Sequence, residues 1–566
     1  MAETNYMSFY GGHDANFTFY NVERNEFLTV ELEKLIDVKH ISWDLRRQTA
    51  LRRPAHQLDY DALWHQLHHL LKTEGWSTRF QHLITGSYYR DFKQSPDTRL
   101  NRADIPLPFD FNLWGPHKGH HKAHAIGAIA QLPPEKAVVL TVDGGGDDGV
   151  AGLWLLDRNN KKFKHVSYVT ERTYSLGGIY RNDASHVPSI ASNTHNYLDL
   201  AGKVMGLSGY GKDIGYNNIS RTKGNKLYDK LRQSAVWGSE LSKFYTTYGS
   251  NNYLMMYPEK HDWREDADIC ATIQARSERL FDRMIEKNWP DFDDMLEQHD
   301  RQLIMSGGYA MNILNNKRIE EKYNCTVWVP PNPGDNGLAF GMLAQYLNDR
   351  NIINFWKDRF DNSTFGPEIR DASLFDDYKN IYQPKKIVLS DLSKMLKQGA
   401  IVALMQGRSE TGFRSLGARS ILCDPSIVTK DQINTIKRRE EYRPFAPVCL
   451  WSEANRWFDV KGDNNYKHMN IAVDVKEEYR KKLHAITHVD GTARLQAIDE
   501  AGFMHDLLTE FDGVLLNTSF NLSGKPICNS MTHALYMLDN TPLDNLVIQH
   551  NDELWCFNKY ENIHDD

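Results

Sequence analysis

The chain has 566 residues, of which 41% are hydrophobic and 25% charged, and its formal net charge is -7 at pH 7. This length exceeds what one ordinary hydrophobic core supports, so the sequence predicts a globular protein of two or three domains. The negative net charge excludes a generally basic protein that coats nucleic acid, although it leaves a local basic face open.

The sequence gives no sign of membrane attachment or of a disulfide framework. No run of eighteen apolar residues occurs, and residues 1–14 lack the basic and apolar parts of a signal peptide. The six cysteines are scattered without CxxC pairs, unlike a disulfide scaffold or a zinc knuckle. We therefore expect a soluble, cytoplasmic protein with no membrane partner.

The first part of the chain repeats one local pattern, an apolar strand that runs into a glycine turn. Residues 7–10 lead through such a turn into a second apolar strand at 17–20, and residues 137–142 lead into another at 150–156. The strand at 303–305 also ends in a glycine turn, before a helical stretch. Strands that end in acidic or glycine turns, mixed with helices, indicate an α/β architecture with ligands at the strand ends.

The composition changes at residues 351–386, where polar and aromatic residues and two prolines show no clear period. A new α/β unit follows, with strands expected at 386–389 and 400–405 around a helix at 391–397. We therefore predict a first domain at 1–355, a linker at 356–385 and a second domain at 386–566.

Two histidines four residues apart are the first candidates for chemistry. On a helix His120 and His124 lie on one face and can share a cation, although capping or packed histidines would give the same spacing. Asp143, at the end of an apolar strand, and Asp335, in a segment rich in proline and glycine, strengthen the metal interpretation. Such mixed nitrogen and oxygen ligands suit iron(II), manganese or zinc rather than calcium. A metallohydrolase is excluded because no glutamate follows the first histidine.

Glycine turns and clustered arginines point to phosphate-bearing ligands. Turns at 144–146 and 307–308, and glycines after Lys203, permit close approach of phosphates and adenosine, although each could be a plain tight turn. In the second domain, arginines within 406–420 and 437–447 alternate with glycine, serine and proline. Their guanidinium groups can form paired hydrogen bonds with phosphate oxygens, or they can form a solvated basic face. The polar cluster that follows the strand 514–516 is either a turn or a holder for a small planar ligand.

Together these segments resemble the O-carbamoyltransferase family, which includes enzymes that carbamoylate nodulation factors and antibiotics. The first half also resembles an actin-like, metal-binding transferase, and the second half resembles a threonylcarbamoyl-adenylate synthase. The matching blocks occur in one order along the chain, at residues 13–15, 33–40, 120–125, 142–147, 202–207, 306–312, 329–335, 412–420, 442–447 and 516–521.

The resemblance implies a two-lobed actin-like α/β domain followed by a smaller α/β adenylate-forming domain. It implies that the smaller domain converts carbamoyl phosphate and Mg-ATP into carbamoyl-adenylate. The actin-like domain would then transfer the carbamoyl group to a hydroxyl, with Fe(II) or another divalent metal. His13, beside Asp14, is our candidate for removing the hydroxyl proton, because an imidazole titrates near neutral pH.

The resemblance also implies roles for individual residues. His120, His124, Asp143 and Asp335 match the metal ligands, and Lys39 falls in a matching block and joins His13 and Asp14 as a catalytic candidate. The expected nucleotide or adenylate contacts are Lys203, Gly206, Gly307, Gly308 and Asn312. The expected contacts to carbamoyl phosphate and ATP are Arg414, Arg419, Lys437, Arg443, Asn517 and Ser519.

The hydroxyl acceptor is open between two classes. Residues 41–102 hold ten basic and six acidic residues with interspersed aromatics, and residues 216–243 add further cations. Because cations follow phosphates and rings accept unstacked bases, the hydroxymethyl group of a DNA pyrimidine of the 5-hydroxymethylcytosine type is one candidate. The other is a sugar-containing small molecule such as an antibiotic or a nodulation factor. An actin-like ATPase or binding module without carbamoyl transfer is a second alternative, which the arginine-rich second domain disfavours. A homodimer is compatible with the sequence. The aromatic residues interspersed among the charges of residues 41–102 are Trp43, Tyr60, Trp64, Trp76, Phe80, Tyr88, Tyr89 and Phe92.

Overall fold

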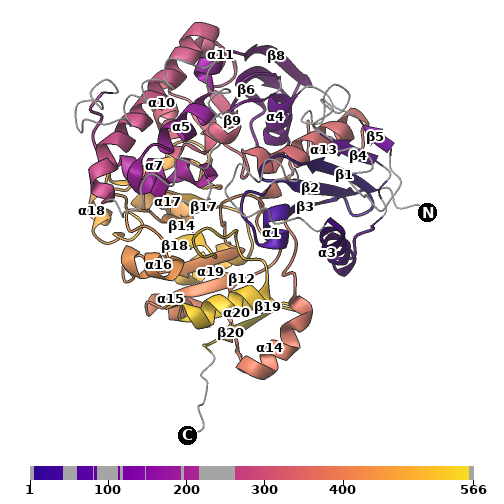
Figure 1. The fold of residues 1–566 in the computed structure, drawn as a ribbon, viewed down its shortest axis with the longest axis vertical. Helices are drawn as coiled ribbons and strands as arrows, with labels where there is room; N and C mark the ends of the chain where they lie inside the picture. Colours follow the sequence, from indigo (N-terminus) through magenta and orange to yellow (C-terminus); the bar gives the residue numbers. More distant parts are fainter. Residues whose placement is uncertain are drawn as a thin grey trace. The chain divides into compact units, whose positions relative to one another are not determined.

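The computed structural model describes residues 5–41, 60–78, 80, 82–85, 112–114, 119–146, 148–192, 197–215 and 262–559. The chain divides into two compact units, shown in Figure 1. The first comprises Met1–Glu26, His40–Leu67 and Arg79–Phe360, and the second comprises Phe27–Lys39, His68–Thr78 and Asp361–Asp566. Two short segments from the amino-terminal part of the chain thus belong to the second unit, which a single linear boundary does not anticipate.

The first unit contains two sheets with the same strand order. In one, β1 (Asn5–Tyr10) pairs antiparallel with β2 (Asn16–Asn21) and parallel with β4 (His82–Thr85), which pairs parallel with β5 (Asn112–Trp114). β1 is therefore flanked by its hairpin partner β2 and by the later parallel strand β4.

The second sheet repeats this arrangement. Here β6 (Lys136–Val142) pairs antiparallel with β7 (Ala151–Asp157) and parallel with β9 (Gln302–Ser306), and β9 pairs parallel with β10 (Thr326–Trp328). β8 (Lys162–Val169) extends this sheet beside β7. β6 is apolar and almost entirely buried, as a central strand flanked on both sides requires. The repeated topology confirms the expected actin-like α/β class.

Two helices of the first unit meet at unusually close range. α4 (His120–Gln131) packs against α13 (Leu338–Asp349) through Gly127 and Gly341. A Cβ added to Gly341 would lie 2.1 Å from the carbonyl oxygen of Ala123, so only glycine allows this approach. The contact fixes the amino-terminal turn of α4 relative to the residues just before α13.

Further helices complete the first unit, and none of those in the described part of the chain is both long and apolar enough to cross a bilayer. α3 (Tyr60–Thr73) contains the boundary between the units at residues 67 and 68. The remaining helices are α5 (Leu176–Ala184), α6 (Pro188–Ser192), α7 (Leu200–Ser208), α10 (Ala267–Asn288), α11 (Phe292–Gln298) and α12 (Ile313–Tyr323).

The second unit is built on an eight-stranded mixed sheet in the order β11-β20-β19-β12-β13-β18-β14-β17. α15 (Leu389–Lys397) and α19 (Phe503–Phe511) pack together and share a hydrophobic core with the sheet (Figure 1). The strands are β11 (Lys385–Ile387), β12 (Val402–Met405), β13 (Arg419–Cys423), β14 (Ala446–Leu450), β17 (Gln496–Ile498), β18 (Leu515–Ser519), β19 (Asn545–His550) and β20 (Glu553–Phe557).

Smaller elements surround this sheet. β15 (Ala472–Asp474) and β16 (Thr492–Arg494) form a separate antiparallel pair. The other elements that lie in the second unit are β3 (Glu26–Glu31, from Phe27 on), α1 (Leu32–Ile36), α14 (Phe375–Tyr382), α16 (Lys430–Lys437), α17 (Trp451–Trp457), α18 (Glu477–Arg480) and α20 (Met531–Asn540).

The segment expected to be a linker, residues 356–385, is largely a packed part of the second unit. It contains α14, whose first residue Phe375 is 3% exposed and stacks on the His550 ring at a centroid distance of 4.0 Å. Trp555 packs edge-on against the Phe375 ring. The sequence does not predict this packed structure, because the segment buries single aromatic side chains rather than a continuous apolar stripe and therefore shows only a weak periodicity.

Candidate active site

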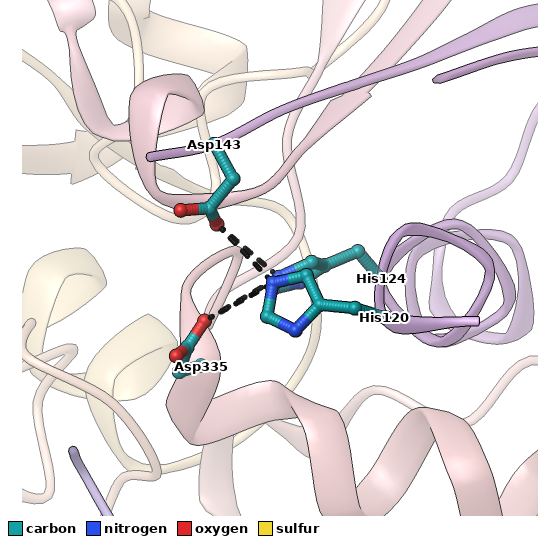
Figure 2. Close-up of side chains that lie close together, drawn as sticks. All are labelled: His120, His124, Asp143 and Asp335. Carbon is teal, nitrogen blue, oxygen red and sulfur yellow. Dashed lines mark hydrogen bonds and ion pairs between the residues drawn. The ribbon is translucent and has the colours of Figure 1, made fainter. Parts of the chain in front are cut away.

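Four potential ligands converge at one end of the second sheet of the first unit. His120 and His124 extend from the first turns of α4, Asp143 follows the last residue of β6, and Asp335 opens a 3-10 turn just before α13. Figure 2 shows both imidazoles pointing from α4 toward the two carboxylates. One ligand atom from each residue lies within 4.8 Å of the other three. The helix spacing and the strand end predicted from the sequence thus meet in space.

The separations between these atoms fit a cation bound among them. The Nε2 atoms of His120 and His124 are 3.2 Å apart, and His124 Nε2 lies 3.3 Å from Asp143 Oδ2 and 3.5 Å from Asp335 Oδ1. His120 Nε2 lies 3.9 and 3.7 Å from the same oxygens. Four tetrahedral ligands, each about 2.1 Å from a metal, would be about 3.4 Å apart. The residues present therefore fit a divalent transition metal, and their nitrogen and oxygen atoms suit iron(II), manganese or zinc.

Neighbouring groups orient both carboxylates. The Tyr10 hydroxyl donates to Asp335 Oδ2 at 2.5 Å, and the Gly308 backbone N–H donates to Asp143 Oδ2 at 2.8 Å. Gly307 has φ 89°, and a Cβ there would lie 2.3 Å from the Val142 carbonyl oxygen. The glycine turn after β9 therefore brings a backbone donor to the ligand Asp143, which is the role that these two glycines have in this structure.

The electrostatics of the group match a site built for positive charge. Burial alone would raise the pKa of the Asp143 carboxyl, but hydrogen bonds from His120 and His124 hold it well below its usual range. Burial alone would lower the pKa of His124, but hydrogen bonds with Asp143 and Asp335 raise it to about 9. The buried Asp335 and the partly buried Asp143 thus stabilise a cation at this position, whether it is a proton on His124 or a metal.

His13 lies beside the cation site. Its Nε2 is 3.2 Å from Asp335 Oδ2, and its Nδ1 is 2.9 Å from Asp14 Oδ2, while its side chain remains 35% exposed. His40 Nδ1 contacts the other oxygen of Asp14 at 2.5 Å. Burial would lower the pKa of His13, but Asp335 and Asp14 together raise it. An oriented, partly exposed imidazole next to the cation site is suited to accept a proton from a bound hydroxyl.

The other sequence-predicted residues of the first unit are placed differently. Lys203 and Gly206 lie on buried positions of α7, which packs against α5 and α10. The Asn312 amide caps α12 through the Asn315 N–H and exchanges hydrogen bonds with Gln274 at 3.1 and 3.2 Å. These bonds occupy the Asn312 side chain, and the geometry favours a structural role over the expected nucleotide contact.

The second unit gathers cations that repel one another. Burial and then repulsion by Arg443 lower the pKa of Arg414 to about 10. Burial, followed by Arg414, Arg439 and Arg443, holds the pKa of Arg494 well below its usual value. Arg443 pairs with the Glu440 carboxylate at 3.9 Å, near the limit for such a contact. We call Arg414, Arg439, Arg443 and Arg494 the arginine cluster, which suits a multiply charged anion.

Unpartnered polar atoms accompany this arginine cluster. Among the described residues, neither Asn517 Oδ1 nor Arg494 Nε has a hydrogen-bond partner, although both atoms are buried. The Asn517 amide nitrogen is held by Gln496 at 2.7 Å and by the Ser415 carbonyl at 3.3 Å, so its orientation is fixed. Buried polar atoms of proteins are normally hydrogen-bonded, so these two atoms have bonding capacity left for a polar ligand.

Three other predicted anion contacts are engaged with the protein itself. Arg419 is fully buried and donates to the carbonyl oxygens of Gln406, Gly407 and Ala418 and to Asn529 Oδ1. Lys437 Nζ donates to Ser519 Oγ at 3.2 Å and to Asn521 Oδ1 at 2.9 Å. This geometry favours Arg419 as a loop-holding residue and leaves Lys437 and Ser519 at the edge of the cluster.

Lys39, expected among the catalytic residues with His13, belongs to the second unit. There the pKa of Lys437 is held well below its usual value by burial and by repulsion from Arg439 and Arg443, to which Lys39 adds a further contribution. The sequence analysis does not identify Arg494, because no other arginine stands near it in the sequence. Arg494 joins the cluster through the pairing of β15 with β16 and the fold of the unit.

The proposed nucleic-acid face lies mostly outside the described residues, including Trp43, Tyr88, Tyr89, Phe92 and the stretch 216–243. Trp64, Trp76 and Phe80 are described, and each is no more than 5% exposed. Trp64 packs edge-on against Phe17. These three rings are core residues, so the expectation that they accept unstacked bases is wrong.

Comparison with known proteins gives matches in both parts of the chain. A family model described as carbamoyltransferase N-terminus matches residues 113–343, and one described as carbamoyltransferase C-terminus matches residues 393–552. Nodulation protein U of Azorhizobium caulinodans is 31% identical over 456 residues, which cover 74% of this chain and 75% of that protein. The 3'-hydroxymethylcephem-O-carbamoyltransferase of Amycolatopsis lactamdurans is 30% identical, covering 76% and 78%. Nodulation protein NolO of Bradyrhizobium diazoefficiens is 29% identical, covering 76% and 77%.

Proposed function

Because the chain belongs to the carbamoyltransferase family, we propose that it transfers a carbamoyl group from carbamoyl phosphate to a hydroxyl, using ATP and a carbamoyl-adenylate intermediate. One observation carries this proposal. The same chain brings together four side chains that fit a cation in its first unit and four arginines that repel one another in its second. A simple ATPase needs no separate arginine-rich anion site, whereas a two-stage transfer through an adenylate uses both the cation site and the anion site.

The first stage belongs to the arginine cluster. Arg414, Arg443 and Arg494 would bind the phosphate oxygens of carbamoyl phosphate and ATP, since guanidinium groups form paired hydrogen bonds with such anions. Water releases phosphate from carbamoyl phosphate, and the resulting carbamate oxygen displaces pyrophosphate from the α-phosphorus of ATP. The unpartnered Asn517 Oδ1 is positioned to accept from the carbamoyl NH2 group or from the adenine amine.

The second stage belongs to the cation site. A divalent cation held by His120, His124, Asp143 and Asp335 would act as a Lewis acid on the carbamoyl or phosphate oxygens. The protein's own contribution is to fix the ligands: Tyr10 and the Gly308 N–H restrict how the two carboxylates rotate. A site prepared in this way needs little reorganisation when charge develops during transfer.

His13 would remove the proton from the acceptor hydroxyl. Asp14 accepts from its Nδ1–H, which leaves Nε2 as the basic atom, and His40 holds Asp14 from the far side. The hydroxyl oxygen then attacks the carbamoyl carbon, the carbon–oxygen bond to AMP breaks, and AMP leaves. The imidazolium that forms is stabilised by Asp335, 3.2 Å from Nε2.

We propose a hydroxymethyl group as the acceptor. A relative's name states that it acts on 3'-hydroxymethylcephem, and the DNA candidate from the sequence, a hydroxymethylated pyrimidine, offers the same primary alcohol. The two sources differ in charge, because only the DNA acceptor carries phosphates that cations of the protein would bind. Since the three described aromatic rings of that candidate face are buried, the DNA acceptor would depend on other residues.

The test is to incubate the purified chain with Fe(II), Mg-ATP and carbamoyl phosphate, together with a panel of acceptors. The panel contains hydroxymethylcytosine oligonucleotides, a hydroxymethylcephem and an aminoglycoside, and mass spectrometry detects the gain of one carbamoyl group. Formation of AMP and pyrophosphate that requires carbamoyl phosphate supports the first stage. ATP hydrolysis to ADP that is independent of carbamoyl phosphate would overturn it. A steep loss of modification with salt would identify the oligonucleotide as the acceptor.

A further inference from the structure

A buried ion pair of the second unit contacts the loop that carries Arg414. Glu31 ends β3 and Lys34 lies three residues on in α1, and both side chains are only 4% exposed. Glu31 Oε1 accepts from the Gly412 N–H at 3.0 Å. Lys34 Nζ pairs with Glu31 and donates to the carbonyl oxygens of Glu410 at 2.6 Å and Gly412 at 3.3 Å. Two side chains thus hold the start of the loop from a segment nearly four hundred residues earlier.

The end of the same loop is held by Glu410. Its Oε1 accepts from the backbone N–H groups of Leu416 at 2.9 Å, Ala418 at 2.7 Å and Arg419 at 3.0 Å. Glu410 is itself fully buried. Arg414 lies between these two attachments, four residues after Glu410 and two before Leu416, so the position of its guanidinium depends on both.

A fixed loop matters because the arginine cluster has no internal attraction. Arg414 and Arg443 repel each other, and a loop with only one attachment could relieve this repulsion by moving Arg414 away. A buried ion pair is rarely worth much in stability, because taking both charges from water offsets most of their attraction. The Glu31–Lys34 pair instead forms hydrogen bonds with the loop backbone, as side chains that position a loop must do.

We propose that the Glu31–Lys34 pair is a clamp that positions Arg414 for binding of the phosphate group of the donor in the second unit. This inference rests on the proposed function for the identity of the donor. Glu31 and Lys34 touch no reacting atom, and they act through Gly412, Glu410 and Arg414.

The test is a mutant cycle on the full chain, with inorganic phosphate as the probe in a calorimetric titration. The double variant E31L/K34M removes both charges and replaces them with apolar side chains, so neither charge is left buried alone. The variant R414A defines the part of phosphate binding that depends on Arg414. We expect E31L/K34M to weaken phosphate binding about tenfold, as loss of a charge-assisted hydrogen bond does. Adding R414A to the double variant should then weaken binding little further.

Additive losses would overturn the clamp, since they would mean that the pair and Arg414 act independently. Unchanged phosphate affinity in a folded E31L/K34M would overturn it as well. The matched control is K525A. It removes a more exposed ion pair, between Lys525 and Asp37, where Asp37 lies in the same segment as Glu31 and Lys34, and it should leave phosphate binding unchanged. If E31L/K34M does not fold, E31Q/K34M replaces it in the same cycle. It leaves no charge buried alone and removes both bonds from Lys34 to the loop carbonyl oxygens, so phosphate affinity should still fall.

The outcome separates this inference from the proposed function. Phosphate binding is measured without turnover, so failure to transfer a carbamoyl group leaves the clamp testable. Conversely, if R414A loses phosphate binding and E31L/K34M retains it, the clamp fails and the anion site remains. With active protein, E31L/K34M should raise the KM for carbamoyl phosphate more than it lowers kcat, whereas simple destabilisation lowers the active fraction without changing KM.

Discussion

His13 Nε2 and Asp335 Oδ2 lie 3.2 Å apart, although more than three hundred residues separate them in the chain. The other oxygen of Asp335 faces His124 at 3.5 Å. One carboxylate therefore has one oxygen toward the cation site and one toward the proposed base. This arrangement couples the two parts of the site, since the orientation of Asp335 sets both the ligand geometry and the environment of His13.

Replacing Tyr10 with phenylalanine tests that orientation. The Tyr10 hydroxyl is a buried donor to Asp335 Oδ2, and loss of such an outer hydrogen bond typically weakens metal binding roughly 10–100-fold. We expect Y10F to bind Fe(II) or Zn(II) weaker by this factor, measured by competition with a chromogenic chelator. H124A, which removes a ligand, should lose more. The matched control is K122A, on the same helix between the two ligands, and a variant Y10F with unchanged affinity would contradict the role of Tyr10.

Replacing His13 with alanine separates the two stages of the reaction. Loss of a general base typically lowers a rate by roughly 10²–10⁴-fold. We expect H13A to lose carbamoyl transfer by this factor, while it keeps its bound metal and its formation of AMP and pyrophosphate, because the arginine cluster is untouched. Rapid quench with labelled ATP and mass spectrometry of the acceptor give both rates. Transfer within a few-fold of the unaltered protein would exclude His13 as the base.

Much of the cation site could be predicted from the sequence, because its ligands sit at positions that local structure defines. His120 and His124 are one helical turn apart, and Asp143 ends an apolar strand. Asp335 is indicated by its segment rich in proline and glycine and by the family resemblance, not by any periodicity. Tyr10 could not be assigned, since a tyrosine in an apolar strand looks the same whether its hydroxyl meets a carboxylate or water.

The expected ligand contacts that the geometry disfavours have a common physical cause. A sequence shows which side chains can bind a phosphate but not which backbone groups already occupy them. Arg419 matches the expected pattern, yet its guanidinium is used by three carbonyl oxygens and by Asn529. Asn312 likewise caps a helix and pairs with Gln274. Arg494 reaches the cluster only through the fold, and the attachment of residues 27–39 to the second unit depends on contacts that no local pattern encodes.

Asp371 gives a prediction about stability and pH. Its carboxylate accepts from the Ser530 hydroxyl at 2.8 Å and from the Thr532 N–H at 3.0 Å at the start of α20. Burial would raise the pKa of Asp371, but bonds from Thr532, Met531 and Ser530 lower it. A carboxyl with a lowered pKa in the folded state stabilises above the ordinary carboxyl pKa and loses this contribution as the pH falls through its folded value.

We therefore expect D371N to lower the free energy of unfolding by about 1 kcal/mol at pH 7, because an amide keeps an acceptor oxygen but loses the negative charge that the N-terminus of α20 stabilises. The difference from the unaltered protein should stay constant from pH 7 to about 5 and shrink below about 4, as protonation removes the charge of Asp371. Urea unfolding followed by circular dichroism at each pH measures it. D463N, at an exposed position outside the helices and strands, is the control and should change stability at no pH. A D371N effect that did not shrink in acid would mean that the carboxylate charge is irrelevant to the cap.

Two glycine-to-alanine changes test whether the close contact between α4 and α13 builds the cation site. In G341A the new methyl group would meet the Ala123 carbonyl oxygen at 2.1 Å, so the helices must separate. Overpacking of this kind costs about 1–3 kcal/mol. It should also move His120 and His124 away from Asp335 and weaken metal binding.

G202A is the matched control, because a Cβ on Gly202 of α7 would meet no atom within 4 Å. Alanine in a helix is favoured over glycine by about 0.5–1 kcal/mol, so G202A should be slightly more stable than the unaltered protein and bind metal equally well. Thermal unfolding with and without Zn(II) measures both effects, since metal that binds only the folded chain raises the midpoint. The increase with Zn(II) should persist in G202A and largely vanish in G341A. If G341A kept the full increase, the ligand geometry would not depend on how closely α4 and α13 approach.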